Sequence, residues 1–98
     1  MAYGIVLEFV SEVGKTQYDA VNEKLGIDMA GGSGAWPEGL KSHAGGTTPG
    51  GFLVMEVWES KALQEAWMGG RLGAALAAVG VPAPIRVTEV DLTGFATP

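Results

Sequence analysis

The stretch that decides the fold is residues 52–58, which read Phe52-Leu-Val-Met-Glu-Val-Trp58. Aromatic and β-branched residues in this density, after a Gly-rich turn, indicate a β-strand. Successive side chains of a strand point to opposite faces, so residues 53, 55 and 57 share one face, and Val54 and Glu56 share the other with the two aromatic ends. Both faces are mostly apolar, which predicts a strand covered on both sides.

The segments around this strand predict a ferredoxin-like βαββαβ order. Apolar residues at helical spacing indicate two helices, the second broken at Gly69-Gly70. Three further β-rich runs complete a four-stranded antiparallel sheet with both helices on one face. We therefore predict an α+β fold in a single domain over residues 1–98. The expected elements are strands 5–10, 39–45, 52–58 and 85–92 and helices 16–25 and 60–79.

Two helices cover only one face of such a sheet, so the other face needs a partner. A face-to-face homodimer would supply a second sheet and enclose a cavity between the two, forming a dimeric α/β barrel. We assign the carboxylate-bearing set, Glu8 and Glu56, to this open face together with Val54 and Trp58. The purely aliphatic set of residues 53, 55 and 57 is expected to face the helices.

Composition narrows the classes of partner. The chain has 98 residues, with Lys+Arg 6 against Asp+Glu 11 and a formal net charge of −5, so nucleic acid is not an expected partner. No apolar run reaches the roughly 20 residues that span a bilayer, and no basic signal-peptide region is present, so we expect a cytoplasmic protein without a membrane partner. Zero Cys and one His predict no metal site within one chain, and we expect no cofactor.

Part of the chain resembles a known superfamily. The stretch from Gly39 to Pro82 contains His43-Ala-Gly-Gly, then Gly51-Phe-Leu-Val-Met-Glu-Val-Trp-Glu-Ser60, then Arg71-Leu-Gly and Val79-Gly-Val-Pro82. It resembles small actinobacterial proteins of the dimeric α/β barrel superfamily, which includes antibiotic-biosynthesis monooxygenases that need no cofactor, polyketide cyclases and haem-degrading enzymes. The resemblance implies a dimeric barrel that encloses an apolar or aromatic small molecule.

Three residues are candidates for acid–base catalysis. His43 titrates near neutral pH and can exchange a proton at a cavity wall, although a strand His can equally be bound to backbone. Glu56 lies between apolar neighbours, where burial favours its protonated form; the alternative is an ion pair with Arg86 or Lys41. Glu8 is a second carboxylate that could exchange a proton; the alternative is that it lies exposed to solvent on the outside of the protein.

The strand register relates two of these candidates. Pairing Ala44 with Gly51 would place His43 opposite Phe52, on the face that also carries Glu56. The two acid–base groups would then lie roughly 13 Å apart, at about 3.3 Å per residue, and flank a ligand without touching each other.

Five side chains are candidates for ligand binding, although aromatic residues of this kind are also typical of a core. Trp58, Phe52 and Val54 would line the cavity, and Arg71 would clamp an anionic group. A Gly-rich stretch, residues 28–37, is long enough to form a lid segment whose part from Ala30 to Gly34 is mobile, with Trp36 as its apolar anchor.

Three functions remain open from the sequence. The first is an enzyme performing cofactor-free acid–base chemistry as a cyclase, isomerase or monooxygenase-like protein. The second is a non-catalytic dimer that binds a hydrophobic molecule or has a structural role. The third is haem binding through His43.

Overall fold

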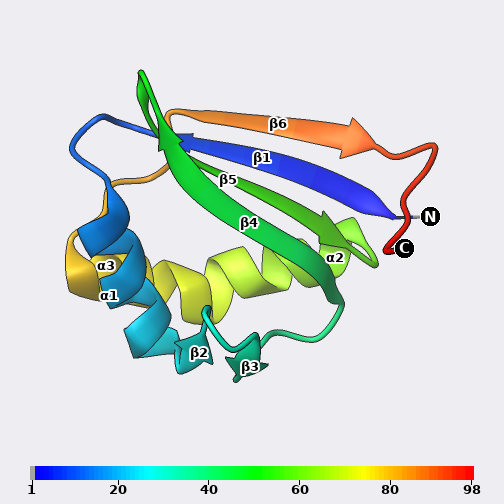
Figure 1. The fold of residues 1–98 in the computed structure, drawn as a ribbon, viewed down its shortest axis with the longest axis horizontal. Coiled ribbons are helices and arrows are strands. Elements are labelled where there is room, and N and C mark those ends of the chain that lie inside the picture. The colour runs from blue at the N-terminus through cyan, green and yellow to red at the C-terminus, as the bar shows by residue number, and fades with distance from the viewer. Residues whose placement is uncertain (1) are drawn as a thin grey trace.

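The computed structural model describes residues 2–98, in which four strands form one antiparallel sheet in the order β4-β5-β1-β6. The strands are β1 (Tyr3–Phe9), β4 (Leu40–Thr48), β5 (Gly51–Trp58) and β6 (Arg86–Asp91). All helices lie on one face of this sheet, as Figure 1 shows, and the other face is open. The predicted ferredoxin-like α+β fold is confirmed.

The helical layer contains α1 (Lys15–Leu25) and a long kinked helix built from α2 (Lys61–Trp67), the π-helical turn η1 (Met68–Leu72) and α3 (Gly73–Val79). Gly70 has non-helical backbone angles (φ −111°, ψ −113°), so the break predicted at Gly69-Gly70 is present. Ser60 starts this helix by accepting a hydrogen bond from the Leu63 amide at 3.3 Å. Within residues 2–98, no helix is long and apolar enough to cross a bilayer.

A small hairpin lies below the helices in Figure 1, formed by β2 (Ile27–Asp28) and β3 (Ser33–Gly34). It contains the first part of the lid segment. Gly34 has a φ of +107°, and a Cβ there would lie 2.3 Å from the Gly26 carbonyl oxygen, so the tight approach of the hairpin to the end of α1 requires glycine.

The two faces of β5 are the reverse of the prediction. Val54, Glu56 and Trp58 face the helices and are buried, with Trp58 fully inaccessible, whereas Met55 is 52% exposed on the open face. Burial of the largest apolar side chains decides which face the helices cover. Glu56 tolerates this position because both of its carboxylate oxygens accept hydrogen bonds.

Glu8 and Glu56 do not share a face, which corrects a second expectation. Ile5 of β1 pairs with Glu56 and faces the helices. Since side chains alternate, Glu8 lies on the open face, where its carboxylate is 3.7 Å from Nε of Arg86.

The β4–β5 register also differs from the prediction. Strand β4 continues to Thr48, which pairs with Gly51, so the turn consists of Pro49 and Gly50 alone. The two β-branched threonines at residues 47 and 48 favour this longer strand. As a result His43 pairs directly with Glu56, and not with Phe52. The prediction that His43 and Glu56 share a face is correct, and the predicted separation of roughly 13 Å is wrong.

Candidate functional site

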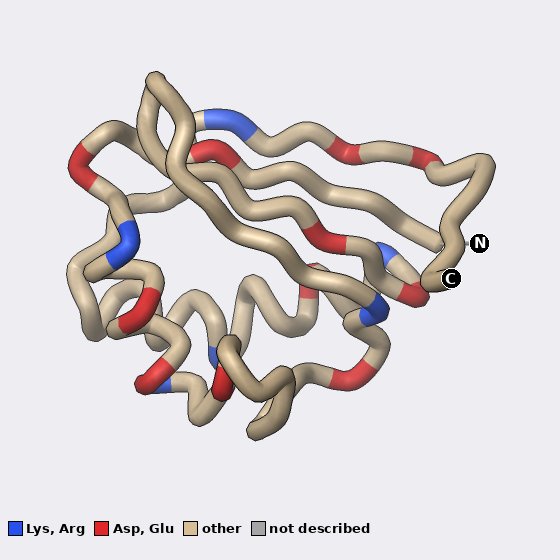
Figure 2. The backbone as a smooth tube through the Cα atoms, in the orientation of Figure 1, with Lys and Arg blue, Asp and Glu red and all other residues tan. Residues whose placement is uncertain are grey.

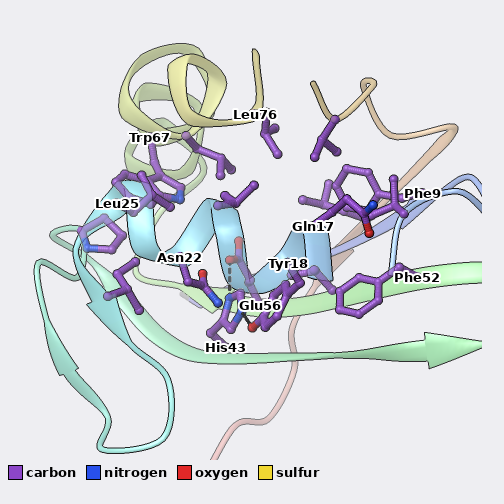
Figure 3. Close-up of a pocket in the computed structure, with 18 of the residues that line it drawn as sticks. Phe9, Gln17, Tyr18, Asn22, Leu25, His43, Phe52, Glu56, Trp67 and Leu76 are labelled. Atoms are coloured by element: carbon purple, nitrogen blue, oxygen red, sulfur yellow. Dashed lines mark hydrogen bonds and ion pairs between the residues drawn. The ribbon is translucent and has the colours of Figure 1, made fainter. Parts of the chain in front are cut away.

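A cavity of about 60 Å³ lies between the helices and the sheet. Its walls are mainly apolar side chains of β1, β5, α1 and the kinked helix, closed by Trp36 and Pro37 of the lid segment. Figure 3 shows His43, Glu56, Tyr18, Asn22 and Gln17 among its lining side chains. This cavity lies within one chain on the helix side of the sheet, whereas the predicted cavity lay between two sheets.

Four side chains in and beside the cavity form a continuous chain of hydrogen bonds. Trp58 Nε1 donates to Glu56 Oε1 at 2.9 Å, and His43 Nδ1 lies 2.7 Å from Glu56 Oε2. His43 Nε2 is bonded in turn to the Tyr18 hydroxyl. We call Tyr18, His43 and Glu56 the relay. Its inner part is shielded from water, because the side chains of His43 and Glu56 are 12% and 4% exposed.

The relay has a definite direction when Glu56 is ionised and His43 is neutral. An indole N–H can only donate, so Glu56 must accept from Trp58, and an ionised Glu56 also accepts from His43 Nδ1–H. A neutral imidazole that is protonated at Nδ1 has its lone pair at Nε2. His43 therefore accepts from the Tyr18 hydroxyl, as the His of a Ser-His-Asp triad accepts from serine.

Tyr18 reaches His43 because Gly45, which has no side chain, lies where α1 crosses β4. A Cβ on Gly45 would lie 2.9 Å from carbons of the Tyr18 ring, so only glycine lets the ring pack so closely on the strand. The Phe52 ring supports it from the side at a centroid distance of 4.9 Å. Burial raises the pKa of the Tyr18 phenol, and the charge of Glu56 adds to the rise.

Asn22 lies one helical turn beyond Tyr18 and is 8% exposed. In the described part of the chain its Nδ2 has no hydrogen-bond partner. The neighbouring Gln17 is different, because its Oε1 accepts from the Gly14 amide at 2.9 Å and so helps to start α1. Neither Tyr18 nor Asn22 is predicted from the sequence as a site residue, although their i, i+4 spacing places them on one face of α1.

Arg71 does not line the cavity. Its Nη2 donates to the Leu25 carbonyl at 2.8 Å and its Nη1 to the Ala35 carbonyl at 3.2 Å, while its guanidinium lies 5.0 Å from the Trp67 ring centroid. The side chain thus ties the end of α1 to the lid segment, next to Trp36. The guanidinium is bonded to backbone carbonyls and does not point into the cavity. A clamp for an anionic ligand, as predicted, would point into it.

The other predicted residues divide into two groups. Phe52, Val54 and Trp36, which were predicted to contact a ligand, line this cavity within one chain, whereas the predicted cavity lay between two sheets. Trp58 lies behind Glu56 and supports it without lining the cavity. Glu8 is on the opposite face of the sheet.

No family model and no curated protein matches the chain. A structure from Chloroflexus aurantiacus, provisionally named an antibiotic biosynthesis monooxygenase, superposes with a TM-score of 0.65 at 18% identity, covering 99% of this chain and 98% of that one. A protein of unknown function from Nitrosomonas europaea gives 0.63 at 21% identity, with 99% and 92% covered. A dimeric ferredoxin-like protein of unknown function from Thermobifida fusca gives 0.50 at 20% identity, with 91% and 86% covered.

The chain has the fold of these proteins. The resemblance seen in the sequence is therefore confirmed for the ferredoxin-like fold. One fold supports many activities, so the activity is argued from the residues of the site.

The relay also limits how a metal ion or haem could bind. Within residues 2–98, no group of three His, Asp or Glu side chains is placed to hold a metal ion. Both ring nitrogens of His43 are occupied, one by Glu56 and the other by Tyr18. A haem iron would have to displace Tyr18 to reach the lone pair of His43.

Charges outside the cavity show no second site. Figure 2 shows acidic positions along the helices, turns and strands, and Lys and Arg spread over the described chain without gathering on one face. The surface ion pairs that form are small and local, such as Lys61 with Glu89 at 2.8 Å.

Proposed function

We propose that this protein is an enzyme that moves a proton on a small apolar molecule bound between the helices and the sheet. The observation that carries the proposal is the relay, which runs from the buried Glu56 through His43 to a tyrosine hydroxyl in a mainly apolar cavity. Buried, mutually oriented titratable groups of this kind are typical of acid–base sites.

The relay makes Tyr18 a general base. When the phenol proton moves to His43 Nε2, the resulting imidazolium is stabilised by the carboxylate of Glu56, and the phenolate can take a proton from the ligand. Reversal of these transfers returns a proton to the ligand at the same or another atom. The sum leaves the enzyme unchanged and isomerises the ligand or exchanges its hydrogen, with no cofactor taking part.

Binding requires the lid segment to move. A cavity of about 60 Å³ is far smaller than the roughly 300–1,000 Å³ of ordinary ligand pockets. Trp36 and Pro37 of the lid segment line one wall. We propose that the lid segment opens to admit a ring-sized ligand and then closes to exclude water.

We also propose that two chains pack through their open sheet faces. Met55 is 52% and Val90 is 39% exposed there, next to Val6, and the Thermobifida fusca neighbour is a dimeric protein of this fold. Exposed apolar surface of this kind favours association.

Hydrogen exchange of a ketone tests the proposed activity without knowledge of the natural substrate. We expect the protein to accelerate deuterium incorporation into 2-indanone in D₂O, followed by proton NMR. Tyr18→Phe and His43→Gln should each lower the catalysed rate by about 100-fold or more, because each interrupts the relay. Tyr3→Phe is the matched control and should leave the rate unchanged, since Tyr3 bonds to Glu89 away from the cavity.

A wild-type rate equal to that of buffer would overturn the enzyme proposal. If 2-indanone nevertheless binds in the cavity, the protein is a carrier of hydrophobic molecules, the second function left open by the sequence.

A further inference from the structure

We infer that Asn22 selects the ligand by donating a hydrogen bond from Nδ2 to a carbonyl oxygen, so that the molecules taken by this cavity are apolar carbonyl compounds. The inference rests on the proposed function in that it concerns the same cavity. It adds the chemical class of the ligand and a residue outside the relay.

The first observation is an unpaired donor inside the protein. Asn22 is more than nine-tenths buried and lines the cavity, yet its Nδ2 has no partner among the described residues. Buried N–H groups are nearly always paired, since an unpaired one gives up its bonds to water and gains nothing in return. An unpaired donor that faces a cavity is therefore explained by a partner that arrives with the ligand.

The second observation is that the other polar side chains of the cavity are engaged. Gln17 Oε1 accepts from Gly14, and Tyr18, His43 and Glu56 bond to one another. Within residues 2–98, Asn22 Nδ2 is thus the fully buried side-chain donor of this cavity that has no partner.

The third observation concerns the charge of the ligand. Among the described residues, no Lys or Arg lines the cavity, and the Glu56 carboxylate is part of its wall, so an anionic ligand would meet no Lys or Arg counter-charge. A carbonyl oxygen is neutral and only accepts, which matches a donor NH₂ group. The apolar remainder of the wall accommodates the hydrocarbon part of the ligand.

The position of Asn22 links binding to the relay. Tyr18 and Asn22 are four residues apart on α1 and so lie on one face of the helix, and Figure 3 shows both beside His43. A carbonyl oxygen held by Asn22 would bring its neighbouring C–H bonds to the Tyr18 hydroxyl. Hydrogens next to a carbonyl are the acidic ones.

The test compares two probes that differ only in the carbonyl, 2-indanone and indane, with binding to the ¹⁵N-labelled protein followed by NMR. We expect 2-indanone to bind at least about tenfold more tightly than indane. Asn22→Leu, of similar shape, should remove this preference while retaining indane binding. Its melting temperature should be unchanged or higher, because the substitution removes an unpaired buried polar group.

A second readout needs no variant. Asn22 is the sole asparagine of the sequence, and its side-chain NH₂ signals should shift on addition of 2-indanone and not of indane. Equal affinity for the two probes, or a preference that survives in Asn22→Leu, would overturn the inference and indicate that water pairs with Nδ2.

The outcomes separate this inference from the proposed function. A carbonyl preference that depends on Asn22, without catalysed deuterium exchange, would support the inference and overturn the enzyme proposal. Catalysed deuterium exchange without a carbonyl preference would support the enzyme proposal and overturn the inference about Asn22. If the wild-type protein binds neither probe, the cavity is not a ligand site and both fall.

Discussion

In the proposed mechanism, Tyr18 is the residue on which the chemistry of the cavity depends. Burial of its ring disfavours the phenolate and raises its pKa, so the hydroxyl stays protonated at neutral pH until His43 accepts the proton. A base with a raised pKa is strong once it is formed. The cost of forming it is offset by the pairing of the His43 imidazolium with Glu56.

The raised pKa of Tyr18 predicts a late alkaline titration. Tyr3 is the other tyrosine, so a Tyr3→Phe variant leaves Tyr18 as the source of tyrosinate absorbance. We expect its ultraviolet titration to lie above the ordinary phenol value of about 10. Because the pKa of Tyr18 is higher in the folded protein than in the unfolded chain, its contribution to the free energy of unfolding is complete below pH ~10. That contribution is lost as the pH rises through the folded-state pKa. A titration at the ordinary value, in protein shown to be folded, would contradict this account.

Individual site residues were only partly predictable. His43 and Glu56 follow from residue type and strand alternation, which place them on one face. Tyr18 and Asn22 do not follow, because their role depends on how α1 crosses β4. That crossing is set by the missing side chain of Gly45, which the sequence shows as one glycine among sixteen.

Among the elements, the lid segment depends most on a single side chain. Arg71 leaves the helix at η1, just after the Gly69-Gly70 break, and reaches the carbonyls of Leu25 and Ala35. The kink predicted from the two glycines is therefore what aims Arg71 at the lid. Which groups it would meet could not be predicted, since both acceptors are backbone atoms that any residue provides.

Removal of this guanidinium should loosen the lid segment. In Arg71→Ala we expect amide hydrogens of residues 28–37 to exchange at least about fivefold faster, because two hydrogen bonds to a charged donor are lost. Hydrogen exchange followed by mass spectrometry measures this. Arg86→Ala, which removes an arginine on the other face of the sheet, is the matched control and should leave the lid unchanged. Equal exchange in both variants would show that Arg71 does not hold the lid.

For the molecule as a whole, the two faces of the sheet have separate roles. The helix face holds the core and the cavity, and the open face holds exposed Met55 and Val90. The layer architecture was predictable from the order of strands and helices. The assignment of faces was not, because β5 is apolar on both sides and its one charged residue proved to be internally paired.

Substitutions at adjacent positions of β5 distinguish the two faces. Met55→Asp should give a folded monomer, since a charge in a sheet-to-sheet interface is unpaired and costs several kcal/mol. Val54→Asp should instead unfold the chain, because that side chain packs beneath the helices. Light scattering during size-exclusion chromatography, with circular dichroism, separates these results. A wild-type mass of a single 10.1 kDa chain would contradict the proposed dimer.

The direct pairing of His43 with Glu56 has a consequence for strand alignment. Strand β4 reads Leu-Lys-Ser-His-Ala-Gly-Gly-Thr-Thr and offers few large side chains to distinguish one alignment from another that is shifted by two residues. A shift that set Gly45 against Glu56 would leave a buried carboxylate without its cation-forming partner. The pair that is proposed to carry protons therefore also holds this edge strand in its alignment. Loss of the imidazole in His43→Ala should disturb the hairpin itself, which is why a glutamine, still able to donate to Glu56, is the better probe of the chemistry.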